Sequence, residues 1–156
     1  MAAETTTKKP VVEIRPTVAA DFAALSKNPL PFRVKAMTGV LHQDGPDGPD
    51  VDGRVIGIAG IGFRPDGIVI AFADLTEEAR AHKVALHRAA RRFLAEAQRT
   101  GFVRLVATGD PQSAAAQRWL DHLGFKRLMR DDAQGRPVED EKVWVLTCTN
   151  KPAAAL

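Results

Sequence analysis

Two basic residues stand just before a long helical pattern, at a place where a protein can hold phosphate groups. Arg80 and Lys83 lie in the turn that runs to Ala85, and apolar residues then recur at helical spacing from Leu86 to Ala97. The first N–H groups of a helix have no partner within the helix, so anions bind there, and a lysine adds positive charge. The turn therefore predicts a phosphate site. The alternative is that these cations and the later arginines form a solvated helix face.

A carboxylate precedes this turn and has the chemistry of a general base. Asp74 follows an apolar run rich in β-branched residues, and Glu77 and Glu78 lie close to it in the sequence. A carboxylate at the end of a strand can take a proton from an amine that must become a nucleophile. The same residue type also caps turns and helix starts, so the sequence leaves both roles open for Asp74.

Other reactive residue types indicate no second site. Cys148 is expected to be a small buried apolar residue, and His82 and His87 are expected to be solvated on the basic helix. The aspartates between His42 and Gly53 do not match the spacing of a calcium-binding loop and lack its closing glutamate. We therefore predict no metal site.

A strand, a turn, a helix, a second strand and a second helix are predicted to position these residues. Ile68 to Ala73 is long enough for a buried strand, and the helix after the turn ends at Gly101, a good C-cap residue. Val103 to Thr108 predicts the second strand, and the second helix runs from about Gln112 to Leu123.

The remaining elements are predicted from shorter patterns. They are strands over 11–15, 33–41, 54–63, 125–129 and 143–147 and a helix over 18–26. Asp131 to Glu141 is predicted to be a polar loop. This order predicts an α/β fold with a mixed sheet and helices on both faces. We expect a single domain over 11–149, a disordered N-terminus over 1–10 and a loose C-terminal tail over 150–156.

The second predicted helix carries a spaced motif. Ser113, Ala116, Leu120 and Gly124-Phe125 fall at spacings that resemble a motif of the GNAT superfamily of N-acetyltransferases, in which Asn, Ala, Tyr and Gly-Phe often stand at those places. The resemblance is degenerate, since only the alanine and the Gly-Phe pair agree. It implies the GNAT fold, which has a mixed, mostly antiparallel central sheet of about six to seven strands with helices on both faces.

The resemblance also implies acetyl-CoA as the cofactor and places it on this chain. The pantetheine arm would pair with the end of the strand before the turn, and the pyrophosphate would lie against the turn, where Lys83 stands in place of a glycine. The implied cofactor-binding residues are Ala73, Leu75, Arg80, Lys83, Val84, Ala85 and Ser113. Asp74 is the candidate catalytic base. Leu120 stands where the family has the tyrosine that returns a proton to the CoA thiolate, and the chain contains no tyrosine.

Two functions follow from this pattern. The first is a GNAT-type N-acetyltransferase, in which a small-molecule or peptide amine attacks the thioester of acetyl-CoA directly. The second is a catalytically silent GNAT-fold protein with a structural or interaction role. The Phe72-Ala73-Asp74 turn and the Arg118-Trp119-Leu120 segment also resemble bacteriophage-encoded GNAT-like proteins. The phage resemblance adds virion proteins to the expected partners. A second copy of the chain, in a homodimer, is another expected partner.

Composition limits the setting in which the protein works. A net charge of +3 is too small to imply nucleic-acid binding by itself, and the arginines of the helix lack interleaved aromatic residues. A single cysteine excludes an internal disulfide and fits a reducing, cytoplasmic location, or a virion-associated one for a phage protein. The sequence shows no apolar signal segment and no run near the ~20 residues of a membrane helix, so no membrane partner is expected.

Overall fold

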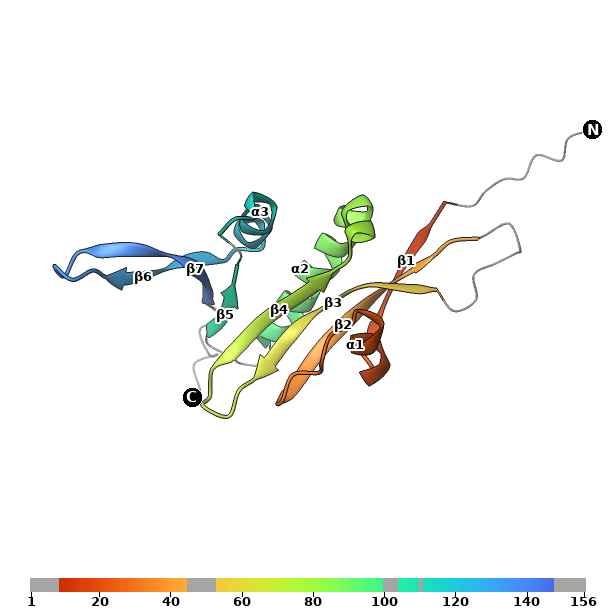
Figure 1. The fold of residues 1–156 in the computed structure, drawn as a ribbon, viewed down its shortest axis with the longest axis horizontal. Helices are drawn as coiled ribbons and strands as arrows, with labels where there is room; N and C mark the ends of the chain where they lie inside the picture. The colour runs from red at the N-terminus through yellow and green to blue at the C-terminus, as the bar shows by residue number, and fades with distance from the viewer. Residues whose placement is uncertain (1–8, 45–52, 100–103, 110, 148–156) are drawn as a thin grey trace, which may run out of the picture. The chain divides into compact units, whose positions relative to one another are not determined.

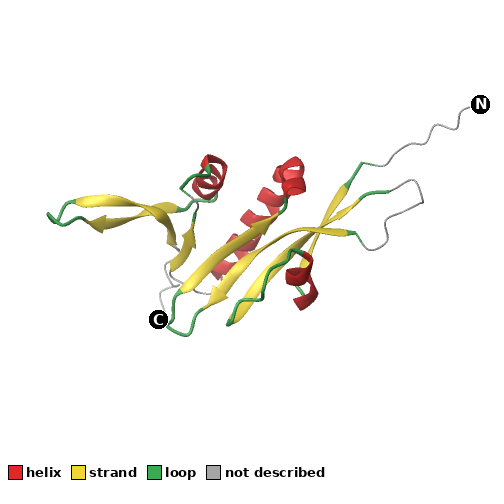
Figure 2. Ribbon diagram, in the orientation of Figure 1, coloured by secondary structure: helices red, strands yellow, loops and turns green. Residues whose placement is uncertain are grey.

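The computed structural model describes residues 9–44, 53–99, 104–109 and 111–147 as strands, helices and short connections (Figures 1 and 2). The elements in chain order are β1 (Val11–Pro16), α1 (Ala19–Ala24), β2 (Arg33–His42), β3 (Arg54–Phe63), β4 (Val69–Leu75), the 3₁₀ helix η1 (Glu77–His82), α2 (Lys83–Arg99), β5 (Arg104–Thr108), α3 (Ala114–His122), β6 (Lys126–Asp131) and β7 (Pro137–Thr147).

The strands form one mixed sheet in the order β1-β2-β3-β4-β5-β7-β6. β1 with β2, β5 with β7 and β6 with β7 pair antiparallel, whereas β4 and β5 pair parallel. The recorded parallel register is short and comprises Ile70 with Val106 and Ala71 with Ala107. The predicted α/β fold with a mixed, mostly antiparallel sheet of about six to seven strands is confirmed, and the sheet has seven strands.

The described residues belong to two compact units, each with its own apolar cluster. One unit lies within residues 1–29, 36–59 and 73–87, and the other within 30–35, 60–72 and 88–156. Leu41, Ile56 and Ala79 form the buried cluster of the first unit, and partly buried Leu86 from the start of α2 packs against it. The buried cluster of the second unit consists of Ile61, Leu94, Ala97, Leu105, Ala107, Phe125, Trp144 and Leu146.

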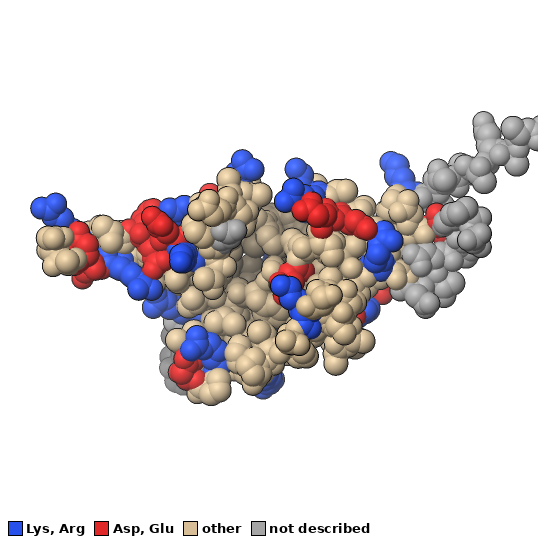
Figure 3. All heavy atoms as spheres, viewed as in Figure 1, with Lys and Arg blue, Asp and Glu red and all other residues tan. Residues whose placement is uncertain are grey.

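The prediction of a polar loop over 131–141 is wrong at 131 and at 137–141, which belong to β6 and β7 and lie in a two-stranded ribbon. Only 132–136 connect the two strands. Charged residues make the cross-strand contacts here, so the apolar alternation that signals a strand is missing. Arg130 Nε lies 2.6 Å from Asp140 Oδ2, and Figure 3 shows acidic and basic side chains interspersed along the ribbon. Such charges protect an edge strand from pairing with another chain.

Several element boundaries differ from the predicted ones. β4 extends to Leu75, two residues beyond the predicted strand end. A 3₁₀ helix occupies Glu77–His82, where an irregular turn was expected. Predictions for the N-terminus before residue 9, for Gly101, for Cys148 and for the tail over 150–156 fall outside the described residues.

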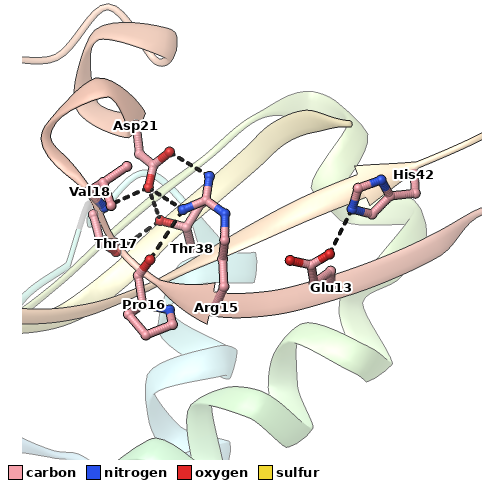
Figure 4. A network of polar contacts seen from close by, with 8 residues as sticks. All are labelled: Glu13, Arg15, Pro16, Thr17, Val18, Asp21, Thr38 and His42. Carbon is pink, nitrogen blue, oxygen red and sulfur yellow. Dashed lines mark hydrogen bonds and ion pairs between the residues drawn. The ribbon is translucent and has the colours of Figure 1, made fainter. Parts of the chain in front are cut away.

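A buried carboxylate joins β1, α1 and β2 in the first unit (Figure 4). Asp21 is only 3% exposed, and its two oxygens each accept a 2.7 Å hydrogen bond from the guanidinium of Arg15. The Val18 N–H and the Thr38 hydroxyl also donate to Asp21 Oδ2, at 2.8 Å each. The hydrogen bonds from Arg15, together with the weaker donors, lower the pKa of Asp21 from 3.8 to about 2. The network therefore holds an ionised carboxylate at the start of α1.

Candidate functional site

Asp74, the predicted base, lies inside β4 and not in the turn that follows it. The end of β4 is anchored to β3 because the Thr76 N–H and hydroxyl both donate to the Ile56 carbonyl, at 2.9 and 3.1 Å. Thr76 occupies the N-cap position of η1, without a side-chain capping hydrogen bond, so Asp74 is not the N-cap of this helix. The Asp74 side chain is 38% exposed, and its Oδ1 lies 3.9 Å from Nζ of Lys27.

Lys27 was not singled out from the sequence, and the end of α1 places it beside Asp74. The Lys27 N–H donates to the Phe22 carbonyl at 2.9 Å, and the Ser26 N–H donates to the Ala23 carbonyl at 3.0 Å. Ser26 has a φ of 55°. These two bonds around a residue in the left-handed region make a Schellman cap, which fixes the backbone at a helix end. A glycine usually marks such a cap in a sequence. Here the residue is a serine, so the cap could not be predicted from the sequence.

Ala73 and Leu75, the predicted partners of a pantetheine arm, are both exposed at the end of β4. The recorded pairing of β4 with β5 stops at Ala71, before either residue. A strand whose backbone groups lack a neighbouring strand can pair with an extended ligand. On the β3 side, a Cβ at Gly57 would lie 2.6 Å from Leu75 Cδ2, so the glycine permits the close approach of the two strands here.

The predicted phosphate turn, Arg80 to Ala85, is helical throughout. The helical backbone begins at Glu77 and continues from η1 into α2 at Lys83 without a break. Backbone N–H groups inside a helix bond to the preceding turn, so the amides of Val84 and Ala85 are less open to a ligand than those of a loop. The first turn carries Glu77 and Glu78, and a carboxylate there competes with a phosphate for the positive end of the helix.

Side-chain charge is what this stretch offers to an anion. Arg80 and Lys83 are both exposed and stand three residues apart, which places them on one side of a helical segment. Arg80 Nε lies 3.7 Å from Glu77 Oε2, and the two side chains are 80% and 85% exposed. Such an exposed ion pair contributes little to stability, so Arg80 can leave Glu77 for another anion. Figure 3 shows acidic and basic side chains side by side in the η1 region.

Ser113 and Leu120, the two motif positions of α3, have structural contacts. Ser113 is the N-cap of α3, and its hydroxyl oxygen accepts a 3.2 Å hydrogen bond from the Ala116 N–H. Leu120 is partly buried and packs against the cluster of the second unit. Position 120 therefore carries a packing residue, which has no proton to donate.

The residues at the end of β4 and along η1 fit an acyl-CoA. Ala73 and Leu75 are exposed and lie beyond the recorded pairing with β5, which suits an amide-bearing arm, and Asp74 lies between them. Arg80 and Lys83 are two exposed cations that would suit a pyrophosphate by charge. Within the described residues, no group of histidine, cysteine and acidic side chains is arranged to hold a metal ion. None of the described helices has the length and apolar character to cross a membrane.

Comparisons with known proteins support the fold. No family model matches the sequence, and no curated protein matches it. Among solved structures, the ribosomal-protein-S18-alanine N-acetyltransferase of Escherichia coli matches with a TM-score of 0.61 and 15% identity over 94% of this chain and 99% of that one.

Two other structures match in the same way. A Salmonella typhimurium protein solved with its cofactor acetyl-CoA has a TM-score of 0.57 and 17% identity over 93% of this chain and 98% of that one. A GNAT-family acetyltransferase of Bacillus anthracis has a TM-score of 0.55 and 13% identity over 87% of this chain and 94% of that one. At these identities the likeness shows the fold alone, which is that of GNAT acetyltransferases.

Proposed function

We propose that this chain is an acyl-CoA-dependent N-acetyltransferase that acts on a small-molecule or peptide amine. The observation that carries the proposal is the end of β4, where Asp74 lies between two exposed residues beyond the recorded pairing with β5. Its support is the fold, which it shares with acetyltransferases, one of them solved with acetyl-CoA.

The residues of this chain then have three tasks. The backbone of Ala73 and Leu75 binds the pantetheine arm as an added strand would, and Arg80 and Lys83 hold the pyrophosphate by charge. Acetyl-CoA, when bound, supplies the activated acetyl thioester. Asp74 accepts a proton from the ammonium form of the acceptor, so that its nitrogen can attack. With Leu120 in the tyrosine position, the departing thiolate takes its proton from water.

A second candidate function is a catalytically silent protein of the same fold, acting as a structural or interaction component, for example in a bacteriophage particle. The helical backbone through Arg80 to Ala85 and the packed Leu120 favour it. Both remove features that the family's enzymes use. The two candidates differ in one measurable property, which is the binding of acetyl-CoA.

The test is the thermal unfolding of the whole chain with and without acetyl-CoA, followed by detection of free CoA with a panel of amines. A ligand at 100 times its Kd stabilises the folded state by about 2.7 kcal/mol, which for a domain of this size raises Tm by roughly 5–10 °C. We expect such a rise with acetyl-CoA. An unchanged Tm at millimolar acetyl-CoA would leave the silent protein as the function.

A further inference from the structure

We propose that Lys27 is itself an acetyl acceptor, so that the protein modifies its own chain beside the candidate base. The inference rests on the proposed function and names an acceptor for it. Lys27 is the one described lysine whose ammonium lies within 4 Å of a carboxylate, and that carboxylate is Asp74. Nζ and Oδ1 lie 3.9 Å apart, which is an ion pair longer than a direct hydrogen bond, so the proton passes when the two exposed side chains close up or take a water between them.

The position of Lys27 is a fixed feature of the fold. Its backbone is held by the cap at the end of α1, where its N–H donates to the Phe22 carbonyl. Asp74 is held from the other side, because Thr76 ties the end of β4 to β3 through two hydrogen bonds to Ile56. Both residues belong to the same compact unit. The backbones of Lys27 and Asp74 are therefore fixed close together, so Nζ stays within reach of the carboxylate at a high effective concentration.

The side chain of Lys27 is also accessible. It is 56% exposed, so Nζ can leave the carboxylate and turn toward a thioester at the exposed end of β4. The ion pair does not oppose this movement strongly, because an exposed pair at this distance contributes little. An arginine or a histidine at the same place would pair with Asp74 but would not form a stable acetyl amide.

The chemical step balances as follows. The Lys27 ammonium gives one proton to Asp74, and the neutral Nζ attacks the carbonyl carbon of the acetyl thioester. The N–C bond forms, the C–S bond breaks, and the second proton of Nζ passes through water to the departing thiolate. Asp74 then releases its proton to solvent. The products are one Nζ-acetyl-lysine, one free CoA thiol and one proton, and no oxidant or metal is needed.

The test uses the purified chain, isotope-labelled acetyl-CoA and mass spectrometry of the peptides that contain Lys27 and Lys35. Lys35 is an exposed lysine of β2 and serves as the internal control for chemical acetylation. We expect Lys27 to be labelled at least tenfold faster than Lys35, to about one acetyl group per chain, with a rate independent of protein concentration. Lys27→Arg should abolish that label, and Asp74→Asn should slow it at least tenfold, whereas Asp66→Asn should leave it unchanged.

A second readout needs no cofactor. In NMR spectra of the lysine Cε groups, we expect Asp74→Asn to shift the signal of Lys27 and to leave that of Lys35 unchanged, because Lys27 lies beside Asp74. Equal labelling of the two lysines, or a Lys27 signal that ignores Asp74, would overturn the inference. If acetyl-CoA binds and an added amine is acetylated while Lys27 stays unlabelled, the inference fails and the transferase stands. If acetyl-CoA does not bind, both fail.

Discussion

Replacing Asp21 by asparagine is expected to lower the free energy of unfolding by about 2–3 kcal/mol at neutral pH. The pKa of Asp21 falls from 3.8 to about 2 in the folded chain, because the fold stabilises the carboxylate more than the protonated acid. A shift of this size corresponds to about 2–3 kcal/mol of folding free energy. Asparagine keeps the shape of the side chain but loses the negative charge, which Arg15 of β1 and the donors at the start of α1 and in β2 stabilise. Total stabilities are about 5–15 kcal/mol, so the loss is large. Urea unfolding measures it as a lower midpoint at unchanged m-value.

The pH dependence gives the same quantity independently. The folded-state pKa of Asp21 is lower than its unfolded-state pKa, so its contribution is fully present above pH about 4 and is lost as the pH falls from about 4 to about 2. The Asp21→Asn variant should lack this part of the acid sensitivity. Asp66→Asn is the matched control, because Asp66 forms an exposed ion pair with Arg64 and such pairs contribute little. Equal losses in the two variants would contradict the role assigned to the buried network.

The double replacement of Arg80 and Lys83 by alanine is expected to weaken acetyl-CoA binding by about 10- to 100-fold, since each charge-assisted contact with a phosphate is worth about 1 kcal/mol or more. In the proposed complex these two side chains bind the phosphates by charge, because the backbone of η1 and α2 is helical there and its amides are less open to a ligand. Calorimetric titration measures the change in Kd. The weakening should shrink at high salt, because exposed charges are screened.

The control for this prediction is Arg88→Ala with Arg91→Ala. Both arginines are exposed on α2, and their loss changes the net charge by the same amount. It should change Kd by less than about threefold if the effect of Arg80 and Lys83 is local. A comparable loss in both double variants would mean that the whole basic helix attracts the ligand without a defined site.

The order of the elements could be predicted from the sequence because it depends on local patterns. The apolar run before Asp74 and the helical stripe from Leu86 predict β4 and α2, and both elements are present there with shifted ends. The β6–β7 ribbon could not be predicted, because ion pairs such as that of Arg130 with Asp140 hold it and leave no apolar alternation. β4 and α2 could therefore be predicted, because burial of apolar side chains drives the formation of both.

The site was harder to predict, because it depends on contacts between distant segments. Asp74 was selected from its place after a strand, but its partner Lys27 is 47 positions earlier in the sequence (74 − 27) and lies after a cap that contains serine in place of glycine. The helical state of Arg80 to Ala85 was also missed, because the family resemblance suggested a loop at that place. Cations at a helix start look alike in sequence whether the backbone there is open or closed.

Amide hydrogen exchange of the whole chain with and without millimolar acetyl-CoA tests the central claim most directly. If the ligand lies along the end of β4 with its phosphates at Arg80 and Lys83, exchange should slow in the peptides that cover Ala73 to Leu75 and the start of α2. The β6–β7 ribbon should exchange at the same rate in both samples. Exchange unchanged everywhere, or slowed only in the ribbon, would contradict an acyl-CoA site at the end of β4.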